Sequence, residues 1–206
     1  MWLGDDMADS LALEVAARLK TLSESGTTIE FMQGNRDFSI GQDYANLCGM
    51  QLLPEFYVLH SQILLCHGDQ LCTLDTGYQR WRKLIRHPLT LWILGHSPKR
   101  FRALLGKKAR LKSLGRQEKQ RKLLQGISKQ HTKNDLKYDV VEKSVTAVLT
   151  LYNAKILIHG HTHKPFDHKN RYVLSDWDRT GDYLCLCFQE HGFEISRHPI
   201  QIVGMD

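Results

Sequence analysis

The sequence predicts a layered α/β domain over residues 1–206, and three strand-like runs carry this prediction. The runs are TTIEFMQ before Gly34, YVLHSQILLC, a predicted hairpin that ends at His67 and Gly68, and AKILIH before Gly160. They are short and rich in apolar residues, and segments of helical periodicity alternate with them. In sheets that alternate with helices, ligands gather beyond the carboxyl ends of the strands, so the three polar loops form the predicted site.

The first helix is predicted from the residues at its two ends and from the spacing between them. Asp9 and Ser10 can cap the start of a helix, and Gly26 is a suitable stop. Apolar residues recur at helical spacing from Leu11 to Leu22. A second helix is predicted from Val140 to Tyr152, directly before the third strand.

Residues 76–137 form a predicted insertion of several short basic helices. The segment lacks the alternation of a strand, and its helical periodicity is broken at five residues. These are Pro88, Pro98, Gly106, Gly115 and Gly126. Large apolar residues give the insertion an apolar side that can cover another group: Trp81, Leu84, Ile85, Leu89, Trp92, Ile93, Leu94, Phe101, Leu104 and Leu105.

Two strands are predicted near the end of the chain, in YLCLCFQ and GFEISRHPIQIV. Alternation along the first strand points Cys185 and Cys187 to one face, where we expect both to be small core residues. The chain has five cysteines and no C-x-x-C pair, so neither a disulfide framework nor a zinc knuckle is indicated. A reducing cytoplasm is the simpler interpretation.

The charge of the chain is unevenly distributed. The formal net charge is +6, but residues 80–133 contain 17 Lys or Arg residues and a single acid, Glu118. Such a cationic element suits an anionic partner such as phosphate, lipid headgroups or nucleic acid, although any single cation could belong to an ordinary solvated helix face. No stretch approaches the roughly 18 apolar residues of a membrane span, and the acidic start MWLGDDMADS is unlike a signal peptide.

His161 and His163 are two residues apart just beyond the third strand, so both imidazoles can turn toward one point. The pair alone is weak evidence for a metal site, because His159 in the same register shows how easily this spacing arises. The complete set is more specific, with Asn35 in GNRD, His67 in HGD and the pair in GHTH. Imidazole nitrogen with amide or carboxylate oxygen suits Mn²⁺, Fe²⁺ or Zn²⁺ in a two-metal hydrolytic centre.

The order GNRD, HGD and GHTH resembles that of calcineurin-like metallophosphoesterases. The longer stretches FMQGNRDF, LLCHGDQLCTLDTGY and LIHGHTHKP are similar to the UDP-2,3-diacylglucosamine hydrolase family. The resemblance implies a single domain with a four-layer α/β/β/α sandwich, in which residues 76–137 form a helical cap. It also implies a Mn²⁺-dependent hydrolase of lipid A biosynthesis in Gram-negative bacteria. Water would attack the α-phosphorus of UDP-2,3-diacylglucosamine and release UMP and 2,3-diacylglucosamine 1-phosphate (lipid X).

The same resemblance implies two Mn²⁺ ions, and four of their ligands match this chain: Asn35, His67 and His161 for one ion, and His163 for the other. Arg36 stands where many relatives have the histidine of GNHD, which serves as a general acid. A departing phosphate needs little protonation, and a fixed guanidinium can brace phosphate oxygens. Arg36 is therefore the predicted catalytic clamp, with local pairing to Asp37 as the alternative.

Five positions match residues that contact the substrate in this family: Arg36, Asp75, Tyr78, Lys133 and His161. Asp75 and Tyr78 would contact the glucosamine and its phosphate, whereas a solvated lysine is the alternative for Lys133. Cys72 lies between these motifs and is predicted to be a packing residue. The apolar side of residues 81–105 would house acyl chains, and its cations would meet an anionic membrane, with ordinary helix packing as the alternative. The implied location is the cytoplasmic face of the inner membrane, as a peripheral protein without an obligate protein partner.

The chain begins inside a family motif, at Trp2-Leu3-Gly4-Asp5-Asp6. The D-x-H and GDxFE motifs that precede it in the family, and that supply an Asp, a His and a bridging Asp to the metals, are absent from the sequence. Asp5 and Asp6 match the acidic pair after the bridging strand and do not replace these ligands. We therefore expect the N-terminal strands to be missing and the chain to hydrolyse the substrate poorly or not at all, as a truncated product or a degenerate paralogue would.

Two other functions fit parts of the sequence. A calcineurin-like phosphoesterase could act on another phosphodiester or on a nucleotide. A basic helical protein could bind nucleic acid through residues 80–133, with an affinity that falls steeply as salt is added. This last reading leaves GNRD, HGD and GHTH unexplained, so we expect no nucleic-acid partner.

Overall fold

The computed structural model describes residues 2–109, 111, 139–177, 181–190 and 192–200. The chain divides into two compact units, the first made of Met1–Glu55 and Leu74–Lys137 and the second of Phe56–Thr73 and Tyr138–Asp206. Both units contain helices and strands, so the predicted α/β class is confirmed. The prediction of a single domain stays a prediction.

Helix α1 (Ser10–Glu24) begins and ends as the sequence predicts. The carboxylate of Asp9 accepts a hydrogen bond from the N–H of Ala12 at 2.9 Å, which satisfies one of the free donors at the helix start. Of the whole helix only Ala16 is fully buried. Several of the apolar residues that define its spacing are exposed, namely Leu11, Val15 and Leu22.

Strand β1 (Ile29–Met32) confirms the first predicted strand and pairs in parallel with β2 (Met50–Leu53). The connection contains helix α2 (Gln42–Cys48), and neither α2 nor β2 is predicted by the sequence patterns. Gly49 ends α2 with φ 67°, and a Cβ atom at this position would lie 2.9 Å from the side chain of Ser23. The core of this unit is built from these elements: Ala16, Ile40, Tyr44, Ala45, Cys48 and Met50.

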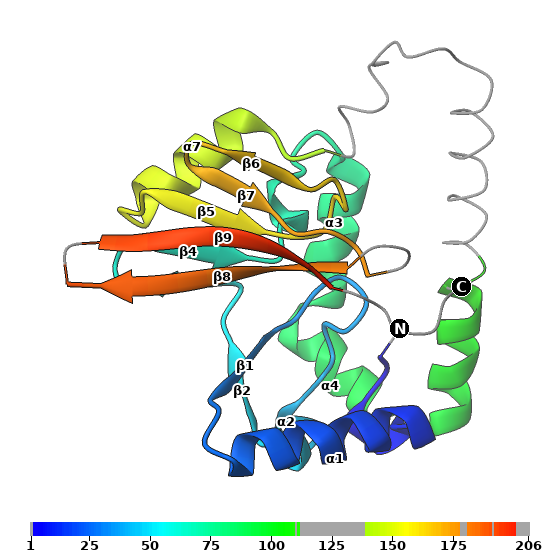
Figure 1. Ribbon diagram of the computed structural model, residues 1–206. Coiled ribbons are helices and arrows are strands. Elements are labelled where there is room, and N and C mark those ends of the chain that lie inside the picture. Colours follow the sequence, from blue (N-terminus) through cyan, green and yellow to red (C-terminus); the bar gives the residue numbers. More distant parts are fainter. Residues whose placement is uncertain (1, 110, 112–138, 178–180, 191, 201–206) are drawn as a thin grey trace, which may run out of the picture. The chain divides into compact units, whose positions relative to one another are not determined.

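The predicted insertion is helical over its described part (Figure 1), which contains α3 (Thr76–Ile85), α4 (Pro88–His96) and a helix over residues 99–109. The predicted break at Gly106 is wrong, because the last of these helices continues through it. The glycine lies against the side chain of Leu3, which a Cβ atom at this position would displace. The predicted breaks at Gly115 and Gly126 lie outside the described residues.

Part of the positive charge of the insertion is used for packing inside the first unit. Arg102 is only 3% exposed and makes two hydrogen bonds to the carboxylate of Asp6, each 2.6 Å long. Arg82 and Arg86 both reach Oε1 of Glu55, at 2.7 and 2.9 Å. These three arginines are therefore anchored to the unit by ion pairs and do not belong to a freely solvated face.

The second unit contains a five-stranded sheet in the order β3-β4-β5-β7-β6 (Figure 1). Its strands are β3 (Phe56–Leu59), β4 (Ile63–Cys66), β5 (Ile156–His159), β7 (Arg171–Val173) and β6 (Phe166–His168). The predicted hairpin of β3 and β4 and the predicted strand β5 are confirmed, as is the helix before it, α7 (Glu142–Leu151). Because β4 and β5 are parallel neighbours, with Cys66 opposite His159, the loops that follow them start side by side.

The last two predicted strands form an antiparallel hairpin of β8 (Gly181–Gln189) and β9 (Gly192–Ile200). Cys185 and Cys187 share one face as predicted, with their sulfurs 3.9 Å apart. Their predicted core role is wrong, because Cys187 is exposed and Cys185 only half-buried. In the described part of the chain β8 pairs with β9 alone, and a two-stranded sheet leaves much of this face to solvent.

Candidate metal centre

The HGD motif forms the loop that follows β4. His67 comes directly after the strand, and a short 3₁₀ turn, η2 (Asp69–Leu71), follows Gly68. Gly68 has φ 107°, and a Cβ atom there would lie 2.8 Å from Nδ1 of His159, so the loop requires glycine at this position. Cys72 is buried with its sulfur 3.8 Å from the carbonyl oxygen of Gly68, which confirms its predicted packing role.

The GHTH motif forms the loop after the neighbouring strand β5 and lies against the HGD loop. The N–H of Gly160 donates to the carbonyl oxygen of His67 at 3.0 Å. The rings of His67 and His161 meet nearly edge to face, with centroids 5.2 Å apart and planes at 67°. Two imidazoles on one ion, at metal–nitrogen distances of about 2.1 Å, have centroids about 5 Å apart. The spacing of this pair therefore fits two ligands of one divalent ion.

His163 lies further along the same loop and is exposed. Its Nδ1 atom is 3.8 Å from Oδ2 of Asp176, a residue that the sequence patterns did not single out. The only signal for Asp176 is that it follows the end of another strand of the sheet, β7. Among the described residues, no three His, Cys, Asp or Glu side chains are grouped so that they could hold a metal ion. Of the predicted ligands in this unit, the structure thus pairs His67 with His161.

His159 precedes this loop and is 1% exposed. Its Nδ1 atom lies 2.9 Å from the carbonyl oxygen of Gly160, and its Nε2 atom accepts a hydrogen bond from Nε of Arg171 at 3.0 Å. Burial lowers the pKa of His159 to about 4, so the ring is neutral at physiological pH. The spacing of His159 in the sequence gives no sign of this contact, because its partner Arg171 is twelve residues away.

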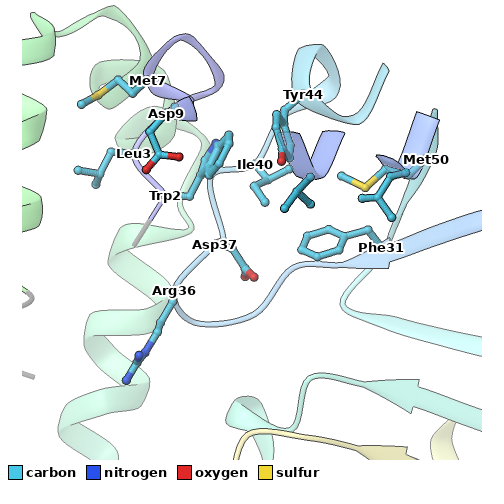
Figure 2. A pocket seen from close by; sticks show the side chains of 13 residues that line it. Trp2, Leu3, Met7, Asp9, Phe31, Arg36, Asp37, Ile40, Tyr44 and Met50 are labelled. Carbon is cyan, nitrogen blue, oxygen red and sulfur yellow. The ribbon is translucent and has the colours of Figure 1, made fainter. Parts of the chain in front are cut away.

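Asn35 and Arg36 lie in the first unit, in the loop that follows β1. The side chain of Asp37 accepts a hydrogen bond from the N–H of Gly34, and burial raises the pKa of its carboxyl group. The guanidinium of Arg36 makes no hydrogen bond or ion pair with the described residues, and Figure 2 shows the side chains of Arg36 and Asp37 pointing apart. The alternative of local pairing between these two residues is therefore not found.

A pocket of about 470 Å³ lies beside this loop (Figure 2). Arg36 and Asp37 contribute to its wall, and most of the other lining side chains are apolar. The larger of these are Trp2, Leu3, Met7, Phe31, Ile40, Tyr44 and Met50. The pocket thus combines the guanidinium of Arg36, which has no partner among the described residues, with an apolar wall.

The remaining predicted site residues have local structural contacts or lie outside the described chain. Asp75 caps the start of α3, where its carboxylate accepts a hydrogen bond from the N–H of Tyr78 at 3.1 Å. Lys133 lies outside the described residues. Asp5 accepts hydrogen bonds from the backbone of α2 and Asp6 holds Arg102, so both carboxylates are engaged in structural contacts. The substrate contacts of Asp75, Tyr78 and Lys133 stay predictions.

No helix in the part of the chain that the structure describes is both long and apolar enough to cross a membrane. The exposed apolar side chains of the insertion are instead distributed over short helices: Trp81, Leu84, Leu89, Trp92, Ile93, Phe101, Leu104 and Leu105.

Comparison with known proteins identifies relatives along almost the whole chain. A protein from Pseudomonas entomophila (strain L48) is 38% identical in an alignment that covers 95% of this chain and 80% of the relative. A protein from Pseudomonas savastanoi pv. phaseolicola (strain 1448A / Race 6) is 39% identical in an alignment that covers 95% of this chain and 77% of the relative. Both relatives are named UDP-2,3-diacylglucosamine hydrolase. No protein-family model matches the chain. On the strength of these relatives, the chain belongs to the UDP-2,3-diacylglucosamine hydrolase family.

Proposed function

We propose that this protein hydrolyses the pyrophosphate bond of UDP-2,3-diacylglucosamine and releases UMP and 2,3-diacylglucosamine 1-phosphate, a step of lipid A biosynthesis. One observation carries the proposal: relatives with this name align over 95% of the chain, through all three motifs. The approach of His67 and His161 at the ends of two parallel strands supports a hydrolytic centre in the same place.

The donor atoms of the motifs fit a moderately hard divalent cation such as Mn²⁺. In our proposal Asn35, His67 and His161 bind one ion and His163 contributes to a second. When bound, such ions supply the Lewis acidity that makes water a nucleophile at neutral pH and neutralises phosphate oxygens. Asp176 lies where it can orient His163 through Nδ1, as carboxylates commonly do for metal-binding histidines.

The reaction places particular demands on Arg36. Water attacks the α-phosphorus, the bond from this phosphorus to the bridging oxygen breaks, and the electron pair stays with the departing sugar phosphate. A phosphate monoester has a second pKa of about 6, so it leaves at neutral pH with little need of a general acid. The Arg36 guanidinium is free of described partners and can therefore hold two phosphate oxygens with parallel hydrogen bonds.

The described helices of the insertion, α3, α4 and the helix over residues 99–109, supply a surface for the lipid part of the substrate. Their exposed aromatic and aliphatic side chains can bury acyl chains, while exposed cations on the same helices, such as Lys83 and Arg100, can meet anionic headgroups. We propose that this segment is a cap that binds the acyl chains and keeps the protein at the cytoplasmic surface of the inner membrane.

The test is a measurement of UMP release from UDP-2,3-diacylglucosamine with and without Mn²⁺. We expect any UMP release to require the metal and to fall at least about a hundredfold in His67→Ala and His161→Ala, since Lewis-acid stabilisation is worth several kcal/mol. His168→Ala is the matched control, because His168 is an exposed histidine on β6 of the same unit. Turnover that survives EDTA or both substitutions would refute the proposal. Faster hydrolysis of cyclic nucleotides than of the lipid substrate would favour the rival phosphoesterase.

A further inference from the structure

The loop that carries His161 has a conformation that L-amino acids rarely adopt. His161 has φ 67° and His163 has φ 54°, so both lie in the left-handed region. A residue other than glycine stays there only where its surroundings fix the backbone. The contacts of Gly160, which precedes His161, therefore decide how the imidazole of His161 is presented.

Two nitrogen atoms hold the carbonyl oxygen of Gly160. The N–H of Thr162 donates to it at 2.8 Å, and Nδ1 of His159 lies 2.9 Å from it. This carbonyl belongs to the planar peptide unit between Gly160 and His161, and turning that unit changes φ of His161. A fixed direction of the Gly160 carbonyl therefore fixes the left-handed φ of His161.

His159 can donate this hydrogen bond because its other ring nitrogen is occupied. Nε of Arg171 donates to Nε2 at 3.0 Å, so the proton of the neutral ring is placed on Nδ1. The guanidinium of Arg171 is itself held between two carboxylates, 3.7 Å from Asp139 and 3.6 Å from Glu142. Since the imidazole of His159 is 1% exposed, water does not compete for either bond.

The HGD loop packs against the same imidazole. A Cβ atom on Gly68 would lie 2.8 Å from Nδ1 of His159 and 3.2 Å from the carbonyl oxygen of Gly160. The glycine therefore lets the HGD loop approach both groups, and the N–H of Gly160 closes the contact by donating to His67. His159 thus touches both of the loops whose imidazoles come together.

We propose that His159 is a positioning residue for the paired imidazoles of His67 and His161. Its ring, held in the Nδ1–H form by Arg171, locks the Gly160–His161 peptide and spaces the HGD loop from the GHTH loop. The role of His67 and His161 as metal ligands rests on the proposed function, whereas the contacts of His159 do not depend on it.

The first experiment compares the Mn²⁺ affinity of the original chain with that of variants at His159. The affinity is measured from the electron paramagnetic resonance signal of the free ion. His159→Leu removes both hydrogen bonds, and the affinity should fall about 10- to 100-fold, as it does when partners that orient metal ligands are lost. His159→Asn keeps a side-chain N–H near the position of Nδ1 and should recover part of the loss. Leu157→Ala is the matched control, because Leu157 is buried on the same strand and its truncation weakens the core without touching Gly160. The control should keep the original affinity at a comparable loss of thermal stability.

The second experiment needs no metal. In nuclear magnetic resonance spectra of the ¹⁵N-histidine-labelled chain, His159 should show the Nδ1–H form. The ring signals of His67 and His161 should move in His159→Leu and stay in Leu157→Ala. Unmoved ring signals together with unchanged Mn²⁺ affinity in His159→Leu would overturn the proposal. If the unsubstituted chain binds no Mn²⁺, the proposed metal centre fails, and the comparison of ring signals decides the role of His159 alone.

Discussion

Arg36 combines an exposed guanidinium with a backbone that is firmly held. Its carbonyl oxygen accepts a hydrogen bond from the N–H of Trp2 at 2.7 Å, and the next residue, Asp37, is tied to Gly34. The side chain is thus presented from a fixed loop without a described partner of its own. Such an arrangement suits a group that binds an oxyanion only when substrate is present.

We expect Arg36→Ala to lower kcat/KM for UMP release by about a hundredfold to a thousandfold, the usual effect of removing one donor to a developing charge. The kcat/KM of Arg36→Lys should lie between those of the original chain and Arg36→Ala, because lysine keeps the charge and loses the two parallel hydrogen bonds. Arg18→Ala, on the exposed face of α1, is the control. Equal rates for the Lys variant and the original chain would show that a point charge suffices and that the proposed two-oxygen grip is wrong.

Tyr44 provides a test of packing in the first unit. Its hydroxyl donates to the carbonyl oxygen of Ala12 at 2.8 Å, and burial raises its pKa from 10.0 to about 12. The folded state therefore keeps the phenolic proton at pH values where the unfolded chain has released it. The stabilising effect is complete below pH 10 and is lost as the pH rises toward 12. Urea unfolding at several alkaline pH values should show this decline, and Tyr44→Phe should flatten it. Identical pH dependence in both proteins would contradict the assignment.

The residues of the site were predictable to the extent that they lie in short motifs. His67 and His161 could be found because each lies just beyond an apolar strand and next to a glycine in the sequence. The role proposed for His159 could not be predicted from the sequence, since it depends on Arg171. This arginine is brought close only when β7 pairs with β5. The exposure of Cys187 was also missed, because alternation along a strand gives the face of a residue and not what covers that face.

At the scale of elements, the helix over residues 99–109 is fastened to the segment before α1 by two ion pairs with Asp6, a close one from Arg102 and a longer one from Lys99. Arg102 is 3% exposed, whereas the side chain of its partner Asp6 is 46% exposed. Removing Asp6 leaves a buried guanidinium without a carboxylate, and removing Arg102 leaves a carboxylate that water can solvate. We expect Asp6→Ala to lower the free energy of unfolding by about 2 kcal/mol, after allowance for the exposure of Asp6, and Arg102→Met by about 1 kcal/mol. Urea unfolding measures both, and the opposite order would contradict this account.

The apolar helices of the insertion predict an affinity for membranes. Trp92 on α4 and Phe101 on the next helix are both more than half exposed. Burying an aromatic side chain of this size in lipid is worth roughly 1.5–3 kcal/mol, so the double variant Trp92→Ser/Phe101→Ser should bind vesicles at least about tenfold more weakly. Co-sedimentation with vesicles that contain anionic lipid measures this effect. Trp177 of the second unit is also more than half exposed, and the control variant Trp177→Ser should bind the vesicles as the original chain does.

Elements with strong local signals were predictable, and those defined by pairing were not. α1 has a capping aspartate, and β4 and β5 are continuous apolar runs, so each is visible in the sequence. β6 and β7 have three residues each and include charged side chains, so only their pairing across a tight turn makes them strands. Gly106 was misread as a helix end, because the sequence pattern does not show that Leu3, distant along the chain, packs against a glycine within the helix.

At the scale of the whole molecule, metal binding should be visible as stability. A ligand that binds only the folded state stabilises it by mass action, by about 2.7 kcal/mol at a hundred times its dissociation constant. We expect Mn²⁺ to raise the thermal unfolding midpoint of the chain and to have little effect on His67→Ala or His161→Ala. Differential scanning calorimetry at several Mn²⁺ concentrations measures the shift. An equal shift in all three proteins would place the metal elsewhere.

The α/β class and the family were predictable for the whole chain, because three motifs in a fixed order are specific. The division into two compact units could not be predicted, since the first unit takes residues from both sides of the segment Phe56–Thr73. Periodicity reports how one segment folds and does not report which distant segment it packs against.

The hairpin of β8 and β9 also determines how the protein responds to thiol reagents. Cys48, Cys66 and Cys72 are buried, so an electrophile added to the folded chain reaches the hairpin first. Hydrogen bonding to Cys185 raises the pKa of Cys187, which leaves less thiolate at neutral pH and slows alkylation relative to an isolated surface cysteine. A monoarsenical dye, whose single arsenic binds two thiols, suits the 3.9 Å separation of this pair. The native sequence therefore carries its own attachment point for a fluorescent label.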